Sequence, residues 1–215
     1  MTWLADNWRT VLDLAGAHLY LAGVPLLVGL VVSLPLGWVA KRWPRSSPAV
    51  ITSTGLLYTI PSLALFVIMP LLLGTQILDP VNVLVAMTIY TVALLTRTVA
   101  DGLTAVPDHV EQAATAMGYK GLRRLVGVEL PLAVPVIAAG LRVAAVSNVS
   151  IVSVASVVGV SQLGDLLVDG YNRVIWAELT TGILACVLLA LVLDLAIQAG
   201  SRALTPWVRA QGGRS

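Results

Sequence analysis

Long apolar segments separated by short polar loops dominate this chain of 215 residues. Only 11% of the residues are charged, whereas a soluble globular domain carries roughly 25%, so we expect lipid to be the main solvent of the chain. A helix needs about 20 mostly apolar residues to cross a bilayer. The sequence therefore predicts an all-α membrane protein with about five spans, at residues 17–40, 49–73, 81–99, 132–160 and 175–199.

The segments at the two ends of the chain differ from the spans. Residues 1–16 mix apolar and charged side chains and contain Trp3 and Trp8, and tryptophan favours the headgroup level of a bilayer. We expect an interfacial segment there, followed by one transmembrane domain over residues 17–200 and a tail over residues 201–215.

Basic residues are distributed unequally between the two sides of the predicted bundle. Because five spans place successive loops on alternate sides, one side receives only Arg9 and Arg173 from the loops and ends of the chain. The other side receives Lys41, Arg42, Arg45, Lys120, Arg123, Arg124, Arg202, Arg209 and Arg214. The positive-inside rule assigns the basic side to the cytoplasm. The C-terminus and the loop at residues 108–131 are therefore expected in the cytoplasm, and the N-terminus outside.

The 108–131 loop has a helical pattern of its own. Val110, Ala113, Ala114 and Met117 recur at the spacing of one helix face. Gly118 follows the last of them, where a left-handed residue would end the helix. The pattern predicts a short helix, a glycine break and a second short helix.

Three further features concern the ends and faces of these two helices. Asp108 and Glu111 are spaced to satisfy free backbone donors at the start of the first helix. Leu122, Leu125 and Val126 continue the apolar spacing in the second helix. An amphipathic helix lying on the bilayer surface is the alternative interpretation.

Two charged residues fall well within the predicted spans. Arg142 lies in the fourth span and Asp194 in the fifth, and a charge inside a membrane is costly unless it is paired or reaches water. We expect the two to form an ion pair between these spans; the alternative is that each side chain extends to the headgroups.

Hydroxyl side chains recur every three residues in the fourth span. Ser147, Ser150, Ser153 and Ser156 lie near one slanting helix face, with Asn148 beside them. They either line a substrate pathway or allow close packing of helices, for which membrane interfaces favour small residues.

The sequence lacks motifs for catalysis and for cofactor or metal binding. It has no phosphate-binding glycine loop and no G-x-S-x-G or H-E-x-x-H pattern. His18 and His109 have no partner at metal-ligand spacing, and we expect His18 at the membrane interface. The single cysteine, Cys186, lies in an apolar segment and is expected to be a packed thiol. The net charge of +2 without a long basic run gives no indication of nucleic-acid binding.

The 108–131 loop resembles the cytoplasmic EAA loop of permease subunits in bacterial ABC importers. The family pattern is E-A-A, three residues, G, nine residues and then I-x-L-P. Here Ala113 and Ala114 are followed after three residues by Gly118, and nine residues later by Val128, Glu129, Leu130 and Pro131. The glutamate position of the pattern holds Gln112 in this chain, and Glu111 precedes it.

This resemblance implies the type I permease fold of an ABC importer and a multi-pass subunit in a bacterial cell membrane. The loop would form coupling helices that dock on a separate ATPase subunit, so this chain would be neither an enzyme nor an ATP-binding protein. The other implied partners are a second permease, identical or homologous, and an extracytoplasmic substrate-binding protein. The residues expected to couple to the ATPase are Gln112, Ala113, Ala114, Met117, Gly118, Leu130 and Pro131.

A second segment narrows the resemblance. Residues 58–65, Y-T-I-P-S-L-A-L, are similar to a segment of permeases for glycine betaine, choline, carnitine and proline, and residues 158–165 fall where that family has a glycine-containing loop. The implied function is import of a small osmoprotectant, with bending expected at Pro25, Pro35, Pro61 and Pro70. Import of another small solute and ion-gradient-driven transport are the alternatives, and the latter would require inverted repeats or ion sites at the membrane centre.

Overall fold

The computed structural model describes residues 2–43, 45 and 47–207, and these residues form helices and turns without a strand. Four helical stretches are long and apolar enough to cross a membrane, and a bent pair of shorter helices makes a fifth. The long stretches are α1 (Thr2–Arg42), α4 (Pro80–Thr104), residues Gly121–Val158 including α7 (Leu130–Ser153), and α9 (Trp176–Leu204). The expected all-α membrane protein is confirmed.

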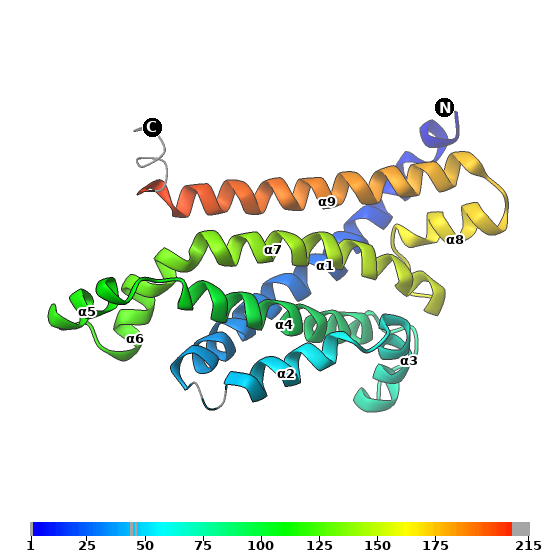
Figure 1. The fold of residues 1–215 in the computed structure, drawn as a ribbon. Helices are drawn as coiled ribbons and strands as arrows, with labels where there is room; N and C mark the ends of the chain where they lie inside the picture. The colour runs from blue at the N-terminus through cyan, green and yellow to red at the C-terminus, as the bar shows by residue number, and fades with distance from the viewer. Residues whose placement is uncertain (1, 44, 46, 208–215) are drawn as a thin grey trace.

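The shorter elements lie at the ends of this bundle and in the bent pair. They are α2 (Ser47–Tyr58), α3 (Ser62–Leu73), α5 (Asp108–Ala116), α6 (Gly121–Arg124), α8 (Gly164–Asn172), the π-helical turn Leu125–Glu129 and the 3-10 turn Val154–Val158. Helices α5 and α6 lie at one end, which we call the loop end, with the last turns of α1 and α9 (Figure 1). Helix α8 and the first turns of α1 lie at the opposite end, so α1 begins and α9 ends at opposite ends of the bundle (Figure 1).

The predicted second span is not one helix, because α2 and α3 meet at an angle of 99°. The break is at Pro61, which has no backbone N–H and disfavours helical geometry in Ile60 before it. The carbonyl of Ile60 instead accepts a hydrogen bond from the hydroxyl of Tyr90 in α4. The ring of Tyr58 packs edge-on against Tyr90, with 5.7 Å between the centroids. By contrast, Pro25 and Pro35 lie inside an unbroken α1 and Pro70 inside α3, so the bending expected at these three positions is not seen as a break.

Other predicted boundaries also differ from the structure. The residues expected to form a separate interfacial segment are the first turns of α1. The loop between the fourth and fifth spans contains α8, whose nine residues are too few to show a clear apolar period. Residues 208–215, with Arg209 and Arg214 of the predicted tail, lie outside the described part of the chain.

Helices α1 and α4 pack closely through small residues. Gly29, Ser33 and Gly37 recur every four residues along α1, and the buried Ser33 hydroxyl donates to the Gly29 carbonyl at 2.6 Å. A Cβ atom on Gly29 would lie 2.4 Å from Cγ2 of Thr91, and one on Gly37 would lie 2.6 Å from Cγ1 of Val99. Small residues of this kind let membrane helices approach where apolar burial gives little driving force.

A buried amide joins three helices at the centre of the bundle. The side-chain Nδ2 of Asn148 in α7 donates to the Ala22 carbonyl of α1 at 3.2 Å and to Oγ1 of Thr91 in α4 at 3.0 Å. Asn148 is 2% exposed, and no water is needed to satisfy it. These hydrogen bonds fix the positions of the three helices relative to one another along the bundle.

His18 lies buried inside the bundle, and its expected position at the membrane interface stays a prediction. The ring is 0% exposed, with Nδ1 2.7 Å from Oε1 of Gln162 and Nε2 3.0 Å from the Val149 carbonyl. Gln162 also donates through Nε2 to the Val152 carbonyl and to Oγ of Ser156. His18 can therefore be buried because Gln162 and Val149, which are distant in the sequence, satisfy its ring nitrogens.

Arg142 and Asp194 form a two-point ion pair between α7 and α9, as the sequence predicts. Nε of Arg142 lies 2.6 Å from Oδ1 of Asp194, and Nη2 lies 2.8 Å from Oδ2. The parallel contacts match the planar geometry of both groups. This pair is a specific polar connection for α9, which otherwise presents mostly exposed apolar residues.

We expect Gly29→Ala to lower stability by about 1–3 kcal/mol, because the added methyl group overlaps Thr91. Gly23→Ala is the matched control: a Cβ there meets only Leu19 at 3.8 Å, so this variant reports the helix-propensity gain alone. Thermal unfolding of the detergent-purified protein measures both. Equal melting temperatures for the two variants would contradict the close packing.

Single charge reversals at Arg142 or Asp194 are expected to reduce the yield of monodisperse protein, because each leaves two like charges facing each other in the membrane. The double variant Arg142→Asp/Asp194→Arg should recover most of the yield. Size-exclusion chromatography after membrane extraction measures this. A double variant no better than either single variant would show that the pair does not hold α7 and α9 together.

Candidate functional site

The 108–131 loop consists of two short helices separated by a left-handed glycine. Helix α5 ends at Ala116, and Gly118 has a φ of +88°, a conformation that costs a residue with a side chain about 1–2 kcal/mol. The backbone N–H of Tyr119 closes the turn by donating to the Ala114 carbonyl at 3.0 Å. Helix α6 then leads through the π-helical turn into α7. The predicted glycine break is confirmed.

The predicted side-chain cap of α5 is wrong. Pro107 occupies the N-cap position and makes no side-chain cap hydrogen bond. The Asp108 side chain makes no hydrogen bond or ion pair with any other residue that the structure describes. Glu111 points to cations on other elements, because charged partners offer a carboxylate stronger hydrogen bonds than a backbone amide does.

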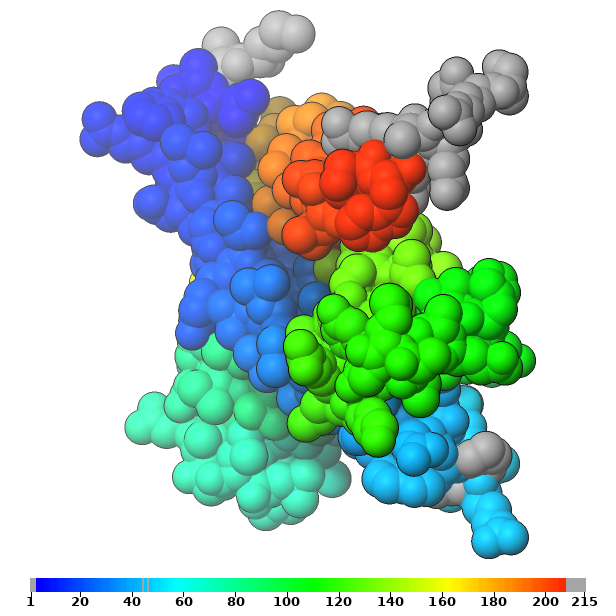
Figure 2. Space-filling model, turned by 90° about the vertical axis from the view of Figure 1, so that its left-hand side faces the viewer, coloured from blue at the N-terminus to red at the C-terminus, as the bar shows by residue number. Residues whose placement is uncertain are grey.

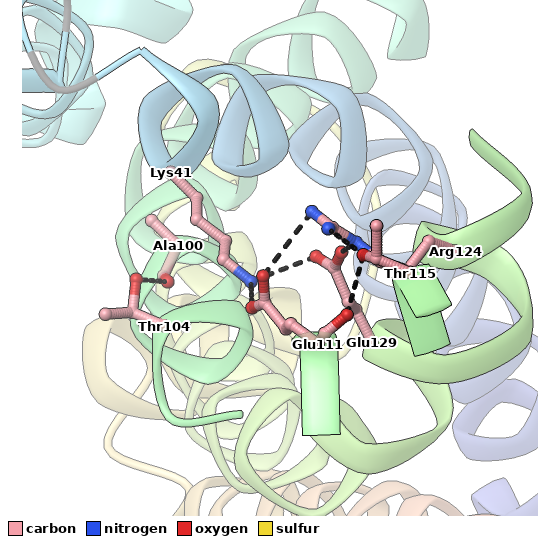
Figure 3. Close-up of polar contacts among 7 residues, drawn as sticks. All are labelled: Lys41, Ala100, Thr104, Glu111, Thr115, Arg124 and Glu129. Atoms are coloured by element: carbon pink, nitrogen blue, oxygen red, sulfur yellow. Dashed lines mark hydrogen bonds and ion pairs between the residues drawn. The ribbon is translucent and has the colours of Figure 1, made fainter. Parts of the chain in front are cut away.

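Four charged side chains form a closed ring beneath the loop, which we call the charged ring (Figure 3). Nζ of Lys41, near the end of α1, lies 2.5 Å from Oε1 of Glu111 and 2.9 Å from Oε2 of Glu129. Arg124 of α6 closes the ring, with Nε 2.7 Å from Oε1 of Glu129 and Nη2 3.4 Å from Oε2 of Glu111. Positive and negative groups therefore alternate around the ring, and their charges sum to zero.

Glu129 is the innermost member of the charged ring. Its side chain is only 2% exposed, whereas those of Lys41 and Arg124 are 17% and 26% exposed. An unpaired carboxylate in such a place would be strongly unfavourable. The Lys41 and Arg124 cations stabilise it, and this requirement fixes the end of α1 relative to α6 and the first turn of α7.

Thr115 extends the charged ring into α5. Nη1 of Arg124 lies 3.1 Å from Oγ1 of Thr115, whose hydroxyl donates to the Glu111 carbonyl at 2.7 Å. The loop is therefore tied to α1 directly through Glu111 of α5, and α6 joins this connection through Arg124, which pairs with Glu111 and Glu129 (Figure 3). An ordinary amphipathic helix on a bilayer surface needs no such connection to the spans.

Sequence reasoning missed the charged ring because its members come from separate segments. Lys41 lies 70 positions from Glu111 and 88 from Glu129, so no local spacing relates them. One signal was available: Glu129 stands in the apolar segment V-E-L-P at the start of a span, where a carboxylate requires a partner.

The residues expected to couple to a partner divide between two faces. Ala114 is 1% exposed and packs inward, whereas Gln112, Ala113 and Gly118 are exposed. Met117 is 71% exposed because α5 ends one residue before it, so it does not share one helix face with Ala114 as its spacing predicts. Leu130 and Pro131 are half-buried in the first turn of α7.

The exposed part of the loop is apolar at its tip. Leu122 and Val126 are 65% and 63% exposed, and with Met117 they form what we call the apolar tip. Viewed from the loop end, α5 and α6 (green) stand between the end of α9 (red) and the start of α2 (cyan) (Figure 2). The loop thus presents an apolar surface beyond the ends of the spans.

The polar residues of α7 also divide between the interior and the surface. Asn148, expected as a candidate for the pathway, is enclosed by α1 and α4, so its role in this structure is helix packing. Ser156 accepts a hydrogen bond from Gln162. Ser150 is exposed and Ser147 and Ser153 are half-buried, so these three remain available on the surface of α7.

Metal-ligating side chains are not clustered in residues 2–43, 45 and 47–207, where no group of three or more His, Cys, Asp or Glu could hold an ion. The candidate site is instead the apolar tip, which is exposed on a loop that ion pairs attach to a membrane helix.

Residues 26–210 match the family described as binding-protein-dependent transport system inner membrane component. The chain is also 30% identical over 206 residues to the glycine betaine/carnitine/choline transport system permease protein OpuCB of Bacillus subtilis, covering 96% of this chain and 94% of the relative. It is 32% identical over 207 residues to the osmoprotectant import permease protein OsmW of Salmonella typhimurium, covering 95% of this chain and 96% of the relative.

Among solved structures, the chain is similar to the methionine ABC transporter MetNI in an inward facing conformation. The TM-score is 0.82 at 20% sequence identity, covering 93% of this chain and 98% of the other. The expected permease fold is confirmed. The family match spans most of the residues, and this chain belongs to the family of binding-protein-dependent transport system inner membrane components.

Proposed function

We propose that this chain is the membrane-spanning subunit of an ATP-driven importer for a small osmoprotectant such as glycine betaine, choline or proline. The names of relatives about 30% identical over nearly the whole chain support this class of solute. The observation that carries the mechanism is the apolar tip, held beyond the spans by the charged ring.

In this proposal, the apolar tip docks on a separate subunit that hydrolyses ATP. Met117, Leu122 and Val126 would enter an apolar recess on that subunit, and Gly118 sets the angle between the two helices. The basic residues at the loop end, including Lys41, Arg42 and Lys120, favour the cytoplasm for that end. The N-terminus would then be outside and the C-terminus inside.

The charged ring offers a route for movement from the ATPase to the spans. A force on α5 and α6 would pass through Glu111 and Arg124 to Lys41, near the end of α1. Helix α1 packs against α4 through Gly29 and Gly37, so both helices would move with the loop. This link would couple nucleotide binding to the opening of the pathway.

The pathway itself would need a second permease, identical or homologous. Ser147, Ser150 and Ser153 lie on an accessible face of α7 and are the residues we assign to its wall. A substrate-binding protein would deliver the solute at the opposite end, where α8 lies (Figure 1).

Ion-gradient-driven transport has less support. Secondary transporters often bind ions at the freed carbonyls of broken helices, and α2 and α3 form a broken pair here. However, Tyr90 already donates to the Ile60 carbonyl at this break. The break therefore functions as a packing feature in this structure.

We expect Gly118→Val to abolish ATP-dependent uptake of radiolabelled glycine betaine by proteoliposomes containing the chain, its ATPase and its binding protein. A valine in the left-handed conformation raises the free energy of the turn by about 1–2 kcal/mol or more. The turn would therefore change its geometry and misalign α5 and α6. Gly118→Asn is the matched control, because asparagine tolerates this geometry.

Co-purification with the ATPase in the same samples separates docking from transport. The Val variant should lose the ATPase and the Asn variant should retain it. Uptake that continues without ATP, or a Val variant as active as the Asn variant, would contradict the proposal.

A further inference from the structure

A hollow with a positive lining lies between the end of α1 and the turn that joins α5 to α6. Its volume is about 230 Å³. The residues that matter for its chemistry are Trp38, Arg42, Thr115, Tyr119, Lys120 and Arg124. We call it the Arg42–Lys120 pocket, and it opens beside the charged ring, with which it shares Arg124.

The charges of this pocket are not balanced. Arg124 is neutralised within the charged ring by Glu111 and Glu129. Arg42 and Lys120 form no ion pair with any residue in the described part of the chain, and no carboxylate is among the residues that line the pocket. Two cations therefore share a small hollow without a counter-ion from the protein, which is an arrangement suited to an anion.

The donor types favour an oxyanion with several oxygens. The planar guanidinium of Arg42 can donate two parallel hydrogen bonds to a phosphate, and the ammonium of Lys120 adds a compact charge. In Arg124, Nε contacts Glu129, Nη1 contacts Thr115 and Nη2 contacts Glu111. Each of the two Nη atoms carries a second N–H group, which can donate to a bound anion.

The position of the pocket matches the headgroup level of a bilayer. It lies where the apolar part of α1 ends, and Trp38 in its wall contacts Trp43, with 6.1 Å between the ring centroids. Tryptophan collects at membrane–water interfaces. Given the orientation proposed above, the pocket faces the cytoplasmic leaflet, where anionic lipids attract basic residues next to a span.

We propose that the Arg42–Lys120 pocket binds a phosphate group, supplied by the headgroup of an anionic phospholipid. Such a phosphate would join Arg42 on α1 to Lys120 in the α5–α6 turn. It would form a second connection between the loop and α1, next to the charged ring, and would hold the loop against the membrane surface.

The test measures binding of soluble short-chain lipids to the full-length, detergent-purified chain by native mass spectrometry. Dioctanoyl phosphatidylglycerol is expected to bind, and zwitterionic dioctanoyl phosphatidylcholine to bind much more weakly. Arg42→Gln and Lys120→Gln should each weaken phosphatidylglycerol binding about fivefold, since a basic residue near an anionic lipid contributes about 1 kcal/mol.

The matched control is Arg45→Gln, which removes the same charge close to Arg42 in the sequence from a residue that does not line the pocket. It should change the affinity less than about twofold. Equal weakening by Arg45→Gln and Arg42→Gln would show diffuse charge attraction and overturn the proposal. Circular dichroism and melting temperature should be unchanged in all three variants, because none of them touches the charged ring.

Inorganic phosphate distinguishes the two sources of the group. Weak binding of inorganic phosphate beside tight binding of phosphatidylglycerol supports the lipid. Equally tight binding of both, weakened by the same variants, would overturn the lipid as occupant. The Arg42→Gln variant could also bind lipid as well as the unchanged protein does but no longer co-purify with the ATPase. That result would show that the pocket binds an acidic group of the ATPase subunit, and it would overturn the proposal. Lipid binding is measured without transport. A negative result would therefore contradict the lipid site without contradicting the proposed function.

Discussion

The structure depends on the neutralisation of one buried carboxylate where the loop turns into a membrane helix. Glu129 is 2% exposed and lies 2.9 Å from Lys41 and 2.7 Å from Arg124. Because a buried charge without a partner is strongly unfavourable, the end of α1 and the end of α6 must both come to it. Glu111 then completes the charged ring. The loop is in this way attached to the spans by electrostatics, in addition to the apolar packing of Ala114 and Leu125.

The bundle can carry a displacement from that attachment because its central helices are closely packed. Gly29 and Gly37 bring α1 against α4, and Asn148 joins both to α7 through hydrogen bonds. Protein interiors packed in this way transmit strain instead of absorbing it. Arg142 and Asp194 extend the connection to α9. A movement of α5 and α6 would therefore shift several spans together.

Much of this fold could be predicted from the sequence, and the exceptions have physical reasons. Apolar length predicted the spans, and the glycine after Met117 predicted the break between α5 and α6. Proline content predicted the break at Pro61, where Tyr90 binds the freed carbonyl, but it did not predict that α1 continues through Pro25 and Pro35. Local spacing likewise could not show that Glu111 binds Lys41 instead of capping α5, since the partner is distant in sequence.

The central claim is that the charged ring makes the loop and α1 one rigid unit. Electron–electron double resonance between spin labels at Gln112 on α5 and Val32 on α1 tests it most directly, with Cys186→Ala to remove the native thiol and the ATPase present. We predict a single narrow distance distribution that is the same without nucleotide and with trapped ATP. A distance that broadens or shifts between the two states would contradict the account.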